Sequence, residues 1–198
     1  MRARLTAGFV ALSLAAFSLT PAIADPFFGG PGGLVLNPNG QMDRVPLRVH
    51  LDRKFMRQIV DYDTREVAGT IVVNTGEKFL YLVLGNGKAL RYGIGTARTG
   101  FEWGGVHVVT NKREWPDWTP PAEMLARQPG IPTHMAGGLG NPLGARALYI
   151  GSTLYRIHGT NEPWTIGTDV SSGCIRLINA DIVDLYSRVK IGAKVIVL

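Results

Sequence analysis

The sequence predicts a mainly β protein built as a β-sandwich or a barrel-like sheet. Short runs rich in Val, Ile, Tyr and Phe recur from residue 45 onward, and turn residues separate them. The triplet Gly85-Asn86-Gly87 lies between two such runs and is typical of a hairpin, because a type I′ turn needs positive φ at its central positions. Many short strands at close spacing favour an antiparallel sandwich or barrel.

Nine strands are expected, and two segments have the pattern of a short helix. The strands are 45–49, 58–62, 70–74, 79–84, 89–94, 106–110, 148–150, 154–158 and 194–198. Residues 121–127 begin with a proline, which suits the first turn of a helix. A second helix is predicted to start at Asn179 as N-cap, to repeat apolar residues at helical spacing and to end before Gly192.

The N-terminal segment is typical of a secretory signal. A basic start, Met1–Arg4, precedes the apolar run Leu5–Leu19, and Ala22-Ile23-Ala24 fits a cleavage site. The apolar run is too short for a membrane anchor, so no stable membrane insertion is expected. We therefore predict a signal peptide over residues 1–24 and an exported, periplasmic protein, followed over 25–67 by a flexible lead-in and the first strands.

Composition narrows the class of partner. The chain has 198 residues, which suits one domain. Its 21 Lys and Arg against 15 Asp and Glu give a formal charge of +6, which suits an anionic polymer such as a cell wall, although it is also an ordinary charge for solubility. No aromatic-basic motif indicates nucleic acid.

The single cysteine, Cys174, cannot form an internal disulfide, so a free exported thiol calls for a function.

Cys174 lies close in sequence to a candidate base. A thiol with a reference pKa of ~8.5 needs a base or nearby positive charge to ionise at neutral pH, and His158 ends a predicted strand. The loop between them contains Gly and Pro and can bring the two together. The small residues Ser171-Ser172-Gly173 leave the N–H groups of Gly173 and Cys174 free to face an oxyanion. The alternative is a buried structural cysteine and histidine.

These residues carry a family resemblance. His158-Gly159-Thr160, fifteen residues between His158 and Cys174, and Ser171-Ser172-Gly173-Cys174-Ile175-Arg176 resemble the signature of L,D-transpeptidases with a YkuD-type catalytic domain. The resemblance covers residues 68–198 and implies the YkuD-type fold. It implies Cys174 as nucleophile, His158 as base and the Gly159 carbonyl as the group that orients the imidazole. The family's usual second histidine is Ser172 here, whose hydroxyl still donates or accepts.

Residues 111–147 form a long segment rich in Pro and Gly, which is typical of a lid or binding loop. The resemblance implies a capping segment in which Trp115, Trp118 and His134 contact the substrate; the alternative is a surface loop anchored by packed tryptophans.

Arg176 lies two residues past the nucleophile and so shares its face of a strand, where it can bind a carboxylate. The alternative for Arg176 is a solvated surface position.

The resemblance implies acyl transfer through a thioester, with no cofactor and no metal. The donor would be a peptidoglycan tetrapeptide stem, cut between diaminopimelate and terminal D-alanine. The acceptor would be another diaminopimelate, a lysine of an outer-membrane lipoprotein, a D-amino acid or, in an endopeptidase or carboxypeptidase, water. Two rivals stay open: a non-catalytic wall-binding protein, and a zinc hydrolase using Cys174 with His158, His134 or His107, which lack paired ligand spacing.

Overall fold

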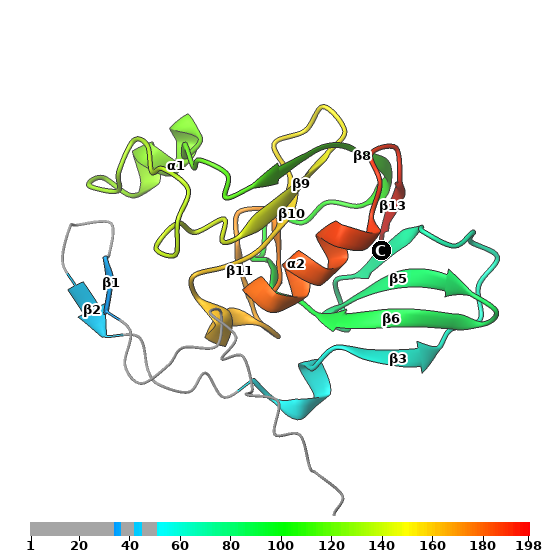
Figure 1. Ribbon diagram of the computed structural model, residues 1–198. Helices are drawn as coiled ribbons and strands as arrows, with labels where there is room; N and C mark the ends of the chain where they lie inside the picture. Colours follow the sequence, from blue (N-terminus) through cyan, green and yellow to red (C-terminus); the bar gives the residue numbers. More distant parts are fainter. Residues whose placement is uncertain (1–33, 37–41, 45–50) are drawn as a thin grey trace, which may run out of the picture.

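The computed structural model describes residues 34–36, 42–44 and 51–198 (Figure 1). The predicted signal peptide over 1–24 and the predicted strand 45–49 lie outside the described residues. Within the predicted lead-in, β1 (Leu34–Leu36) pairs antiparallel with β2 (Met42–Arg44), so that segment contains a short hairpin pairing that its composition did not indicate. None of the described helices combines the length and apolar character that crossing a bilayer requires.

A nine-stranded sheet dominates the described part of the chain, in the order β12-β10-β9-β8-β13-β4-β5-β6-β3. Its strands are β3 (Gln58–Asp61), β4 (Ile71–Asn74), β5 (Phe79–Gly85), β6 (Lys88–Gly93), β8 (Gly105–Glu114), β9 (Arg146–Ile150), β10 (Arg156–His158), β12 (Ile175–Arg176) and β13 (Lys194–Val197). A second pair joins β7 (Thr96–Ala97) to β11 (Asp169–Ser171). The helices are η1 (Arg53–Phe55), α1 (Ala122–Arg127), η2 (Pro163–Thr165) and α2 (Asn179–Arg188).

The predicted mainly β fold is confirmed, but the sheet is mixed rather than antiparallel. β10 pairs parallel with β12, β13 with β4, and β11 with β7. Alternation of apolar residues does not encode strand direction, so sequence pattern alone did not separate the two cases. β8 also extends to Glu114 and β9 begins at Arg146, which shortens the predicted capping segment from 111–147 to 115–145.

The predicted hairpin between β5 and β6 is confirmed. Gly85, Asn86 and Gly87 have φ values of 87°, 51° and 69°, the left-handed region that glycine and asparagine tolerate. The pairing register shifts between Val83 and Gly85, so the turn includes a bulge.

Alternate residues of the central strands fill two apolar clusters. Ile71 and Val73 of β4 pack with α2 in the larger core, and Val72 faces a second cluster with Tyr81 on the opposite side of the sheet. Figure 1 shows α2 lying across the sheet between β9 and β6, where Ile182 and Leu185 are fully buried. The helix therefore closes the main core.

The start of α2 differs from the prediction by one residue. The N-cap is Ile178, and Asn179 is the first helical residue. The Asn179 side chain instead accepts a hydrogen bond of 2.9 Å from the backbone N–H of Ala145. Asn179 thus joins α2 to the end of the capping segment rather than capping its own helix.

Two aspartates of α2 differ in how well their charges are compensated. Asp184 accepts a hydrogen bond of 2.7 Å from the Tyr92 hydroxyl and lies 3.2 Å from Arg57. Asp181 is only 4% exposed, its Oδ1 lies 3.7 Å from Arg57, and its Oδ2 is buried without a hydrogen-bond partner. Burial raises the pKa of Asp181 to about 6, Arg57 opposes this shift, and Asp184 adds to it.

We expect the substitution Asp181→Asn to stabilise the protein at about pH 8 and to have little effect at about pH 4. The folded-state pKa is raised, so the contribution of Asp181 to stability is complete below its ordinary pKa of 3.8 and is lost as the pH rises to about 6. Removing the charge should add roughly 1–3 kcal/mol to the free energy of unfolding at the higher pH. Urea unfolding at both pH values measures this.

The exposed Asp63 provides the matched control, since Asp63→Asn removes the same charge outside the core. An equal change in unfolding free energy for Asp181→Asn at both pH values would contradict the assigned role of burial.

Candidate active site

The parallel pairing of β10 and β12 brings the predicted nucleophile and base to one face of the sheet. Ile157 is register partner of Ile175, and both are buried in the core. Side chains alternate along a strand, so the neighbours of these isoleucines project to the opposite face. Those neighbours are Arg156, His158, Cys174 and Arg176. Cys174 comes directly before β12, level with Arg156 and diagonal to His158.

His158 is held as a neutral base. Its side chain is 3% exposed, and Nδ1 is 2.5 Å from the carbonyl oxygen of Gly159. A carbonyl only accepts, so Nδ1 carries the proton and Nε2 keeps its lone pair. Burial, together with the charges of Arg176 and Arg156, lowers the pKa of His158 to about 3, while the hydrogen bond to the Gly159 carbonyl opposes the shift.

Cys174 is partly exposed, and its sulfur lies 4.0 Å from the carbonyl oxygen of Leu154. Burial raises the pKa of the thiol, and the nearby charges of Arg156 and Arg176 work against that shift. Among the described residues, no hydrogen bond joins the sulfur to the His158 imidazole. The resting pair is therefore a neutral thiol and a neutral imidazole on the same face, with the thiol directed to Leu154.

Ser171 fixes the turn that carries the nucleophile. Its hydroxyl donates to the carbonyl of Cys174 at 2.6 Å and accepts from the N–H of Gly173 at 3.1 Å. The Gly173 N–H, predicted to face an oxyanion, is thus already engaged. The N–H of Cys174 has no hydrogen-bond partner in the described part of the chain. Ser172, which replaces the family histidine, is partly exposed beside it.

Trp103 supports this turn from a distant part of the sequence. Its indole Nε1–H donates to the carbonyl of Gly173 at 2.5 Å, and its ring stacks on Tyr155 with centroids 4.4 Å apart. The sequence does not indicate this role, because a tryptophan inside a glycine-rich turn gives no signal for a partner seventy residues away. Trp103 and Tyr155 together form an aromatic wall against Gly173, the residue before Cys174.

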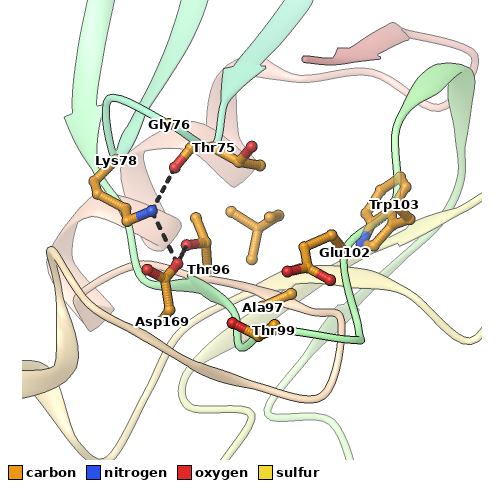
Figure 2. A pocket seen from close by; sticks show the side chains of 10 residues that line it. Thr75, Gly76, Lys78, Thr96, Ala97, Thr99, Glu102, Trp103 and Asp169 are labelled. Atoms are coloured by element: carbon orange, nitrogen blue, oxygen red, sulfur yellow. Dashed lines mark hydrogen bonds and ion pairs between the residues drawn. The ribbon is translucent and has the colours of Figure 1, made fainter.

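A hollow of about 220 Å³ adjoins this wall, as Figure 2 shows. Lys78 lies on one side of it and Glu102 on the other, with Trp103 at its edge. Lys78 pairs with Asp169 at 2.9 Å, and Asp169 also accepts from Thr96. Neither the thiol nor the imidazole lines the hollow, so it is separate from the face that carries Cys174.

The capping segment, residues 115–145, is organised around Asn141. This side chain is 1% exposed; its amide donates to the carbonyls of Pro116, Met135 and Ala136, and its oxygen accepts from Leu143. Asn161, three residues after His158, donates to the Gly140 carbonyl at 3.1 Å. The segment is therefore tied to the loop that follows the predicted base.

The residues predicted to contact substrate lie in different settings. Trp115 and Trp118 are partly buried within the capping segment, and the backbone of Trp118 pairs with Met135. His134 is 57% exposed and 3.8 Å from Asp117. The guanidinium of Arg176 already donates to Glu162 at 2.8 Å, so the predicted carboxylate grip is occupied by a carboxylate of the chain itself.

The zinc alternative lacks a ligand set. Across the residues that the structure describes, no group of three or more His, Cys, Asp or Glu side chains is placed to hold a metal ion. His107 lies beside Trp103, with ring centroids 5.2 Å apart, and His134 belongs to the capping segment. The four residues proposed as ligands do not form a cluster.

Comparison with known proteins gives a consistent family. The family model for YkuD, described as an L,D-transpeptidase catalytic domain, matches residues 68–197. The probable L,D-transpeptidase ErfK/SrfK of Escherichia coli strain K12 is 39% identical over 148 residues, covering 70% of this chain and 46% of that protein. The chain thus spans about half the length of this curated relative.

Solved structures support the same fold. A crystal structure from Brucella melitensis, named a probable carnitine operon oxidoreductase, is 46% identical with a TM-score of 0.51 and covers 75% of this chain and 96% of its own. The catalytic domain of an Enterococcus faecium L,D-transpeptidase acylated by ertapenem is 20% identical with a TM-score of 0.52, covering 67% of this chain and 99% of its own. The latter likeness shows the fold alone.

We expect Gly173→Ala to destabilise the protein more than Gly100→Ala. Both glycines have left-handed φ, +113° and +85°, so both substitutions carry backbone strain of about 1–2 kcal/mol. A Cβ at Gly173 would also lie 2.4 Å from the Tyr155 ring, whereas one at Gly100 meets nothing within 4 Å. Overpacking should add roughly 1–3 kcal/mol at Gly173. Chemical denaturation of both variants measures the difference, and equal losses would refute the close contact.

Proposed function

The chain belongs to the YkuD family of L,D-transpeptidase catalytic domains, and on this basis we propose that it is a peptidoglycan L,D-transpeptidase acting through a cysteine thioester. The observation that supports the proposal is the pairing of β10 with β12, which puts Cys174 and His158 at diagonal positions, together with the Gly159 carbonyl, which leaves the lone pair of His158 on Nε2. A nucleophile with an oriented neighbouring base is the arrangement that covalent acyl transfer uses.

The first half-reaction begins with rotation of the Cys174 side chain from Leu154 toward His158. Because the two resting groups are neutral, the thiol proton passes to Nε2 as sulfur bonds to the amide carbonyl of the donor. The free N–H of Cys174 stabilises the oxyanion, an interaction whose loss typically costs ~3 kcal/mol of barrier. The C–N bond then breaks, and the imidazolium protonates the departing amine of D-alanine.

The second half-reaction reverses these roles. An acceptor amine attacks the thioester, His158 removes the amine proton, and the sulfur leaves and regains its proton from His158. The acceptor is another diaminopimelate, a lysine of an outer-membrane lipoprotein or a D-amino acid; water in this position would make the protein an endopeptidase or carboxypeptidase.

Substrate recognition follows from the charges near the thiol. A tetrapeptide stem carries carboxylates, and one of them can replace Glu162 on the guanidinium of Arg176. Trp115, Trp118 and His134 of the capping segment contact the same stem. Export through a signal peptide over residues 1–24 would place the protein in the periplasm with its substrate.

The name of the Brucella relative suggests an oxidoreductase instead. We do not extend that name to this chain, because the face of β10 and β12 presents a nucleophile, a base and two cations, which are groups for acyl transfer. Acylation of Cys174 by a carbapenem separates the two activities, as it requires an accessible acylating thiol.

We expect ertapenem to add one covalent adduct to the wild-type protein and none to Cys174→Ala. The related Enterococcus faecium domain is acylated by this compound, and the thiol here is the only sulfur nucleophile in the chain. Intact-protein mass spectrometry measures the adduct. Ser172→Ala is the control that keeps the nucleophile, so it should still acylate, at a somewhat lower rate.

Incubation with tetrapeptide muropeptides then identifies the acceptor, since cross-linked, exchanged and trimmed products differ in mass. An adduct on Cys174→Ala, or a wild-type protein that neither acylates nor converts muropeptides, would end the proposal.

We expect the acylation rate of the wild-type protein to stay nearly constant from about pH 7 down to about pH 5, where an ordinary histidine base would already be protonated. The pKa of His158 is about 3, so the imidazole stays neutral through this range and the acidic limb lies lower. Stopped-flow ertapenem acylation measures the profile, with His158→Gln as the variant that should slow by about 10²–10⁴-fold. A wild-type limb near pH 6.5 would contradict the effect of burial on His158.

A further inference from the structure

Arg156 is the residue level with Cys174 across the β10–β12 pair. Its register partner on the other side is Tyr149 of β9, and its guanidinium lies 5.1 Å from the centroid of the Tyr149 ring. This cross-strand contact holds the arginine side chain on the face that carries the nucleophile. Its position is therefore set by two neighbouring strands.

The contacts of Arg156 and Cys174 converge on one carbonyl. Arg156 Nη1 donates to the Leu154 oxygen at 3.2 Å, and the Cys174 sulfur lies 4.0 Å from the same oxygen. The positive charge of Arg156 lowers the pKa of the thiol, against the effect of burial. The Nε of Arg156 is buried and has no hydrogen-bond partner. The guanidinium and the sulfur thus lie against the same carbonyl oxygen, and the guanidinium keeps one unused donor.

The two arginines near the thiol differ in their charge balance. Arg176 is neutralised by Glu162, whose carboxylate lies 2.8 Å from its guanidinium. Arg156 pairs with no carboxylate among the residues for which the structure gives contacts. His158, which lies on the same face, is kept neutral by burial. The uncompensated positive charge next to the sulfur is that of Arg156.

We propose that Arg156 is a catalytic residue that stabilises negative charge on the Cys174 sulfur through its guanidinium. It acts when the thiol proton moves to His158 and the sulfur attacks, and again when the acceptor displaces the sulfur from the thioester; the second part rests on the proposed function. The proton passes between sulfur and Nε2 in both cases, and Arg156 keeps its own protons.

His158 and Arg156 would then have different roles at the thiol. His158 supplies a lone pair but is a weak base, because burial disfavours its charged form. Burial also disfavours the thiolate, so an adjacent fixed cation offsets part of that penalty. Substrate would displace Glu162 from Arg176, whereas no carboxylate among the described residues pairs with Arg156. The charge of Arg156 therefore acts on the sulfur in every state.

The test is the pH dependence of Cys174 alkylation by iodoacetamide, a neutral reagent that the arginine charge does not attract. We expect Arg156→Gln and Arg156→Met to move the midpoint of the alkylation profile upward by about one pH unit or more, which makes alkylation at pH 7 about tenfold slower. Arg156→Lys keeps a cation and should shift the midpoint less. Arg65→Gln, an exposed arginine between β3 and β4 at the far end of the sheet, is the matched control and should leave it unchanged.

Thermal unfolding is measured for each variant, and either neutral variant that remains folded decides the outcome. A midpoint equal to that of the wild-type protein in a folded Arg156→Gln or Arg156→Met would overturn the proposal. The result is independent of turnover. A shifted midpoint in a protein that ertapenem does not acylate would reject the transpeptidase function and keep the role of Arg156. Acylation by ertapenem with an unshifted midpoint would keep the transpeptidase function and reject the role of Arg156.

Discussion

The pairing of β10 with β12 is the constraint on which the site depends. Two core isoleucines, Ile157 and Ile175, fix the register of these strands, because shifting it by one residue would expose one of them. That register sends the residues on either side of them to the opposite face. Cys174, the proposed nucleophile, is thus positioned by the packing of its apolar neighbour in the core.

Burial then sets the charges of the site. The imidazole loses basicity and the thiol loses acidity when both leave water, so the two groups rest neutral rather than as an ion pair. A neutral pair limits reaction of the thiol in the absence of substrate, since the thiolate is the reactive form. Positive charge from Arg156 and Arg176 reduces the cost of ionising the buried thiol. The Gly159 carbonyl keeps the histidine in the tautomer that accepts a proton.

Residues far from Cys174 in the sequence hold the turn before it and the capping segment in place. Trp103 holds the turn before the nucleophile through the Gly173 carbonyl, and Tyr155 packs so closely on Gly173 that only glycine fits there. Asn141 satisfies four backbone groups of the capping segment and so gives shape to a stretch with little regular structure. Asn161 and Asn179 connect that segment to the loop after His158 and to α2. The capping segment, although rich in Pro and Gly, is therefore held in place by specific hydrogen bonds.

The sequence by itself determined eight strands of the main sheet but not β12, together with the β5–β6 turn and the motif around Cys174, because alternation, left-handed glycine turns and short spacings are local properties. It also led to the correct family. Strand direction, the extent of β8 and the start of α2 were decided by tertiary packing. Only the folded chain brings Trp103 to Gly173 and Glu162 to Arg176, and it engages the Gly173 N–H that the sequence left free. Arg156 gave no signal in the sequence, since its importance comes from lying beside a sulfur on the next strand, and such proximity arises from sheet register.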